Sequence, residues 1–186
     1  ILNGKSLGKK PVDKYEMLTV DVPYEAGKLE AIGYKGDQQA ATFTVETTGK
    51  AATIQLVPDR SAIANDGRDA VPVAVEIVDD QGRVVPTAGD MVRFTLSGPG
   101  AIIGLNNGDP NCHESEKGDA HSAFHGLAQV ILQSRAGNPG AITLHATAEG
   151  LKGADLTLTA TPAMLEPSVP AVSAPPPPAT RGRRGG

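Results

Sequence analysis

The sequence has no tryptophan and only one cysteine, and aromatic residues make up just 3% of its 186 positions. A single cysteine, Cys112, excludes an internal disulfide framework and any zinc or iron–sulfur site built from several cysteines of this chain. No apolar run approaches the roughly 18 residues that a membrane span requires. The formal net charge of −4 does not favour nucleic acid as the main partner. We therefore expect no cofactor, no nucleic-acid partner and no membrane insertion.

The segment 162–186 differs in composition from the rest of the chain. It reads PAMLEPSVPAVSAPPPPATRGRRGG and consists mainly of Pro, Ala, Gly and Ser, followed by three arginines. Such a segment buries too little apolar surface to offset the entropy of ordering it. It predicts a disordered linker or tail.

Alternation of apolar and polar residues dominates positions 51–161. In the run Val71–Ile77 every second residue is Val or Ile, as expected of a strand with one buried face. Similar runs occur at 94–96, 130–132, 142–146 and 156–158. Turn residues such as Asp80-Gln81-Gly82 separate the runs. The pattern predicts an all-β fold, with residues 51–161 forming one complete immunoglobulin-like β-sandwich domain.

Residues 1–50 follow the same pattern but hold too few strands. Asn3-Gly4 is a hairpin signal, and strand-like runs follow at Tyr15–Asp21, Lys28–Tyr34 and Ala40–Glu46. A sandwich of the immunoglobulin type needs about seven strands. We therefore expect residues 1–50 to be the C-terminal part of another sandwich domain, truncated at its N-terminus. The chain would then be a C-terminal fragment of a longer protein.

Two clusters of side chains are candidates for catalysis and for metal binding. Glu114 and Glu116 are close enough in sequence for an acid/base pair, but nothing nearby indicates a desolvating pocket. Four potential metal ligands also lie close together in the sequence: Cys112, His113, His121 and His125. Because adjacent residues of an extended chain point to opposite faces, Cys112 and His113 make a poor ligand pair. We expect no catalytic residue and no metal site in this chain.

The stretch Asn106–Pro110 predicts a tight turn, since Asn and Asp side chains bond their own backbone. Loops on sandwich scaffolds often carry function, so Asn107, Asp109, His113 and Glu114 are candidates for a contact with another domain or with the rim of a substrate cleft. Tyr24, between Pro23 and Glu25, is the candidate for stacking on a sugar ring. The three phenylalanines lie in strand-like runs and are expected in the core: Phe43, Phe94 and Phe124.

Several stretches are similar to a known enzyme family. The opening LNGKSLGKK and the run VPYEAGKLEAIGYKGDQQAATFTVETTGKAA resemble the immunoglobulin-like domain that follows the catalytic barrel in a group of glycoside hydrolase family 2 enzymes. Residues 52–160, with the motif NGDPxxHE, resemble the invasin-like domain that comes next. The resemblance implies a parent of the β-galactosidase type that is secreted or periplasmic and retaining, with two glutamates on a (β/α)₈ barrel.

That barrel is absent from the sequence, so no position inherits a catalytic role. The resemblance implies two partners: the upstream barrel of the same chain, and the carbohydrate substrate of the parent enzyme. Two alternatives remain open, because function resides in sites and not in folds. The first alternative is a bacterial surface adhesin or spacer module, and the second is a carbohydrate-binding module.

Overall fold

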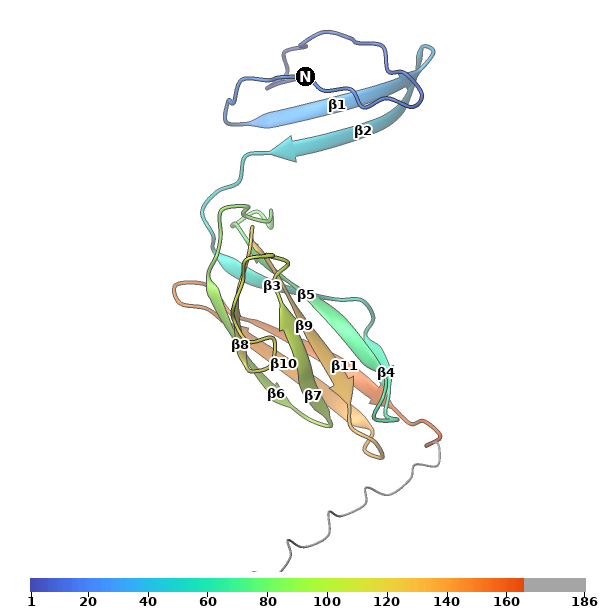
Figure 1. The fold of residues 1–186 in the computed structure, drawn as a ribbon, viewed down its shortest axis with the longest axis vertical. Helices are drawn as coiled ribbons and strands as arrows, with labels where there is room; N and C mark the ends of the chain where they lie inside the picture. The colour runs from blue at the N-terminus through green and yellow to red at the C-terminus, as the bar shows by residue number, and fades with distance from the viewer. Residues whose placement is uncertain (166–186) are drawn as a thin grey trace, which may run out of the picture.

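The computed structural model describes residues 1–165, which form strands and no helix. Figure 1 shows a two-layer β-sandwich and, beyond a single connection, a small N-terminal sheet. The all-β sandwich class is confirmed. No helix long and apolar enough to cross a membrane occurs in this range. Most of the predicted tail, from residue 166 onward, lies outside the described residues.

The sandwich consists of a five-stranded sheet of order β4-β11-β10-β6-β8 and a four-stranded sheet of order β3-β5-β9-β7. All neighbouring strands are antiparallel except β4 and β11. The strands are β3 (Thr53–Pro58), β4 (Ala62–Ala64), β5 (Ala70–Val78), β6 (Met91–Ser97), β7 (Gly100–Asn106), β8 (Ala120–Ser122), β9 (Leu127–Ser134), β10 (Gly140–Thr147) and β11 (Ala154–Thr161).

One apolar core lies between these two sheets. The alternating side chains of β5, from Val71 to Ile77, are fully buried, and they pack in one cluster with Phe94 of β6 and Leu144 of β10. Each such side chain contributes about 1.5–3 kcal/mol relative to an exposed one. The predicted period-two pattern is confirmed on both sheets.

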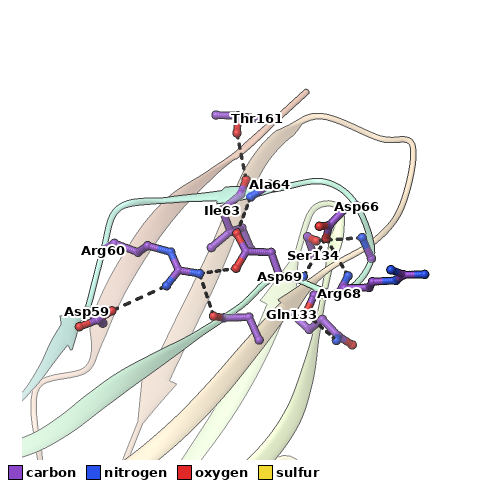
Figure 2. Close-up of polar contacts among 12 residues, drawn as sticks. Asp59, Arg60, Ile63, Ala64, Asp66, Arg68, Asp69, Gln133, Ser134 and Thr161 are labelled. Carbon is purple, nitrogen blue, oxygen red and sulfur yellow. Dashed lines mark hydrogen bonds and ion pairs between the residues drawn. The ribbon is translucent and has the colours of Figure 1, made fainter. Parts of the chain in front are cut away.

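A polar network closes one end of the sandwich, where the chain crosses between sheets (Figure 2). After β3 the chain leaves its sheet, pairs as β4 beside β11 of the other sheet, and returns as β5. The carboxylate of Asp69 accepts hydrogen bonds from the Ala64 amide, at 2.7 Å, and from the Arg60 guanidinium. Arg60 also donates to the carbonyl of Ala70. These contacts hold the crossing segment in place.

The N-terminal sheet is a hairpin of β1 (Lys28–Lys35) and β2 (Gln38–Glu46). Leu29 faces Val45 across the ladder and Ala31 faces Phe43, so these side chains share one face. That face is open: Phe43 is 71% exposed and Val45 54%. The expectation that Phe43 is a core residue is wrong, because no second sheet covers β1 and β2 within residues 1–165. Phe94 is buried as expected, and Phe124 is partly exposed.

The Asn3-Gly4 turn is confirmed, with φ angles of 49° and 82°. The stub Ile1-Leu2, which precedes this turn, lies along β1, and the Glu30 amide donates to the Ile1 carbonyl at 2.8 Å. The Asn3 side chain accepts a hydrogen bond from the Lys28 amide at 2.8 Å. The opening motif thus anchors the start of the hairpin.

The predicted strand at Tyr15–Asp21 is wrong. This segment has no ladder partner in the described part of the chain and contains a turn in which the Glu16 amide donates to the Asp13 carbonyl. Tyr15 and Met17 are almost fully exposed. An extended segment needs both a backbone partner and a face to bury, and residues 1–165 offer this one neither.

Candidate functional site

The loop between β7 and β8 has no regular secondary structure but is internally bonded. The Asn106 side chain accepts a hydrogen bond from the Gly108 amide at 2.6 Å, and Asn107 accepts one from the Asp109 amide at 2.9 Å. Asp109 in turn accepts one from the Asn111 amide at 2.9 Å. Each side chain closes a local turn on the backbone two residues ahead. The predicted turn chemistry is therefore present.

Two of the candidate residues converge on Ser122, at the end of β8. The Asn107 side-chain amide donates to the Ser122 carbonyl at 3.1 Å, and the Ser122 amide donates to the Glu114 carboxylate at 2.7 Å. Asp109 instead stays within its own turn. His113 is exposed and makes no hydrogen bond in the described part of the chain. The four candidates are therefore not one cluster, and their proposed contact with another domain stays a prediction.

The Glu114 carboxyl is held in its charged form. Hydrogen bonding to Ser122 lowers the pKa of Glu114 by more than burial raises it, and the nearby His121 ring lowers it slightly further. A general acid in a glycosidase requires a raised pKa instead. Glu116 is exposed, and its backbone carbonyl accepts a bond from the Leu105 amide. This arrangement does not favour an acid/base pair at Glu114 and Glu116.

The structure selects a different set of potential metal ligands from the one considered in the sequence. Three potential ligand atoms lie within 4.8 Å of one another, one from each of Cys112, Glu114 and His121. His125 lies apart, with its ring nitrogen 3.0 Å from the carbonyl of Pro86. The Cys112–Glu114 spacing of two residues, which places side chains on one side of an extended chain, is the sequence signal that points to this pairing.

A second cluster, which sequence reasoning missed, lies where the hairpin joins the sandwich. The buried carboxylate of Asp79 accepts hydrogen bonds from the amides of Gly49, Gln81 and Arg83. Burial raises the pKa of Asp79, but these bonds and the Arg83 guanidinium outweigh that effect and hold the pKa far below its usual range. Arg83 also pairs with Glu46 at the end of β2. The cluster, here called the linker clamp (Glu46, Gly49, Asp79 and Arg83), fixes the connection between the two sheet systems.

Tyr24 is 82% exposed, in the irregular segment before β1. Its ring is accessible as the proposed sugar-stacking surface requires. Stacking on a sugar stays a prediction for this residue.

Comparisons with known protein families give two matches. The family described as glycoside hydrolase family 2 C-terminal domain 5 matches residues 54–157. A domain of unknown function, DUF4982, matches residues 1–41. The first match falls within the sandwich, and the second reaches into β2.

Similar proteins are larger glycosidases. The β-galactosidase BoGH2A of Bacteroides ovatus is 38% identical over 160 residues, covering 86% of this chain and 19% of that protein. A β-glucuronidase of Formosa agariphila is 33% identical, covering 87% and 16% respectively. A β-glycosidase structure from Bacteroides vulgatus superimposes with a TM-score of 0.81 at 28% identity, covering 86% of this chain and 20% of that one. The chain thus spans about a fifth of the length of these relatives.

Proposed function

Because the chain belongs to glycoside hydrolase family 2, we propose that it is a non-catalytic β-sandwich part of a longer glycosidase and serves as a scaffold for the catalytic barrel. The parent in this proposal is a retaining enzyme of the β-galactosidase type that is exported from the cell. Its carbohydrate substrate binds at the barrel. The similarity to much larger β-galactosidases and β-glucuronidases supports this role.

The observation that carries the proposal is the uncovered apolar face of the β1–β2 hairpin. Leu29, Phe43 and Val45 form this face, and all three are exposed. An isolated two-stranded hairpin is at best marginally stable in water and needs further strands or a packed layer. A contiguous apolar sheet face of this kind marks an interaction surface. Its proposed occupant is the remainder of the same domain in the longer protein.

The linker clamp supports the scaffold role independently. A flexible tether between two adhesive modules needs no buried anchor, whereas a scaffold must hold its parts at a set angle. The buried Asp79 carboxylate binds the linker backbone at Gly49, and Arg83 reaches back to Glu46. These contacts favour a fixed support over a free spacer.

The test compares two proteins on nitrophenyl β-galactoside and β-glucuronide. The 186-residue chain is expected to show no turnover above buffer, and its Glu114→Gln variant should behave identically. The longer protein that contains the chain is expected to hydrolyse at least one of the two substrates. Turnover by the 186-residue chain that disappears in the Glu114→Gln variant would overturn the non-catalytic assignment. A longer protein that cleaves no glycoside would overturn the family 2 parent.

A second arm tests whether the rest of the domain covers the apolar face of the hairpin in the longer protein. Phe43→Ser in the longer protein should lower its melting temperature, because the Ser side chain forfeits an apolar contact. The same substitution in the 186-residue chain should change little, since Phe43 is exposed there. Thr44→Ser, on the other face of β2, serves as the control. An equal, small effect of both substitutions in the longer protein would show that the apolar face stays uncovered there, which contradicts the proposed packing of the rest of the domain on it.

A further inference from the structure

Three side chains of different chemistry meet beside strand β8. Cys112 and Glu114 lie in the loop between β7 and β8, and His121 lies on β8 itself. We propose that Cys112, Glu114 and His121 form a binding site for one Zn²⁺ ion, which ties this loop to the edge strand of the sandwich. The four candidate ligands in the sequence do not include Glu114, and the adjacent Cys112 and His113 make a poor pair, so the sequence alone predicts no metal site.

The spacing of the potential ligand atoms fits a small tetrahedral ion. Zinc–nitrogen and zinc–oxygen bonds of about 2.0–2.2 Å place two such ligands roughly 3.3–3.5 Å apart at the tetrahedral angle. The Nδ1 atom of His121 and the Oε2 atom of Glu114 are 3.4 Å apart. The three ligand atoms all lie within 4.8 Å of one another, and a zinc–sulfur bond of about 2.3 Å corresponds to sulfur–nitrogen separations of roughly 3.6 Å. Closing the ligand atoms from 4.8 Å to about 3.6 Å takes a movement of about one ångström, which we assign to the half-buried Cys112 side chain.

Two of the three ligands are already held in place. The His121 ring is buried, with only 2% of the residue exposed, so its orientation is set by packing. The Glu114 carboxylate is oriented by the hydrogen bond from the Ser122 amide. Cys112 is half-buried, and its amide donates to the Asp109 carbonyl at 3.1 Å. Such preorganisation lowers the entropy that metal binding costs.

The ligand types select the metal. A thiolate disfavours Ca²⁺ and Mg²⁺, which take oxygen ligands, while sulfur, imidazole and carboxylate together suit Zn²⁺. Glu114 is solvent-exposed enough for a water molecule to complete four-coordination. Binding requires that the Cys112 thiol lose its proton to solvent. His121 must bind as the tautomer with its proton on Nε2, which releases the Ser122 carbonyl now 3.0 Å from Nδ1.

The test uses the 186-residue chain, stripped with a chelator and titrated with Co²⁺ and with Zn²⁺. Cobalt is expected to give a thiolate-to-metal absorption band in the near ultraviolet and visible bands of tetrahedral intensity, at one equivalent. Zinc added to the cobalt-loaded chain should replace Co²⁺ and so abolish the near-ultraviolet and the visible bands. Zinc added to the metal-free chain should raise its melting temperature. Cys112→Ser is expected to remove the near-ultraviolet band and to weaken Zn²⁺ binding at least tenfold. His113→Ala, next to the site but outside it, is the matched control and should bind like the natural chain.

Circular dichroism of the metal-free Cys112→Ser variant checks that it folds. Because Cys112 is only half-buried, we expect this substitution to disturb the fold little. Glu114→Gln, expected to weaken binding without removing the sulfur band, provides a second variant. Absence of a thiolate band in the natural chain would overturn the proposal and leave the cluster as a hydrogen-bonded loop anchor. Equal loss of binding in His113→Ala and Cys112→Ser would also overturn it, because it would show general surface chelation.

Discussion

The guanidinium of Arg83 lies 2.7 Å from the carboxylate of Asp79, whose side chain is completely buried. Through its other amino group the same guanidinium contacts Glu46, 3.3 Å away at the end of β2. One arginine thus joins the sandwich to the hairpin, while Asp79 also binds the linker backbone at Gly49. The orientation of the connection is therefore specified by a buried anion and not by the length of the linker.

The first prediction concerns that anion. Asp79→Asn should lower the melting temperature of the 186-residue chain by several degrees. Gly49 donates to one oxygen of the carboxylate, and Gln81 and the Arg83 amide donate to the other. In asparagine one of the two oxygens is replaced by an NH2 group, which cannot accept a hydrogen bond, and the negative charge opposite the Arg83 guanidinium is lost. Calorimetry measures the shift. Asp80→Asn, at the exposed neighbouring position, is the control and should leave the melting temperature nearly unchanged. Equal shifts for both variants would contradict a specific role for the linker clamp.

The second prediction follows from the pKa of Asp79, which is lower in the folded chain than its ordinary value of 3.8. A depressed folded pKa means that the unfolded state binds the proton more tightly, so the stability contributed by Asp79 is fully present above the unfolded pKa. It declines as the pH falls through 3.8 and is lost below the folded value. The melting-temperature gap between the natural chain and Asp79→Asn should be constant above about pH 5 and should narrow in more acidic buffer. A gap that widens on acidification would show the opposite linkage.

Much of the sandwich was predictable because its chemistry is local. The alternation in Val71–Ile77 sets which side chains face inward, and that needs no knowledge of the partner sheet. The Asn3-Gly4 turn was equally predictable, since few residues adopt positive φ at two successive positions. Phe43 has the same local pattern as Phe94, yet one is exposed and the other buried. The difference lies in whether a second sheet covers the strand, which no local pattern contains.

The polar clusters were less predictable for a related reason. Asp79 and Gly49 are 30 residues apart in sequence, and their contact depends on how the linker meets the sandwich. In the loop before β8, sequence reasoning named Glu114 but grouped it with Asn107, Asp109 and His113 as one contact surface. The structure places Glu114 against Ser122 and His121 instead. Long-range pairing of strands, which brings β8 beside the loop, determines these contacts.

The third prediction contrasts two phenylalanines. Phe94→Ala should destabilise the 186-residue chain by about 3–5 kcal/mol, because it leaves a cavity between the two sheets. Phe43→Ala should change the free energy of unfolding of the sandwich little, since Phe43 lies on the open face of the hairpin. Urea denaturation of both variants measures the two values. A large loss for Phe43→Ala would mean that the hairpin face is covered within this chain, against the structure.

The last prediction concerns the loop before β8. Asn107→Ala should cost about 1 kcal/mol, because it removes the side-chain donor to the Ser122 carbonyl and the acceptor for the Asp109 amide. Hydrogen exchange of the loop amides should become faster in this variant than in the natural chain. Asn106→Ala is the matched control, since the exposed Asn106 side chain only accepts a bond from the Gly108 amide. Equally fast exchange in both variants would show that local turns hold the loop, and that its contact with β8 through Asn107 contributes nothing.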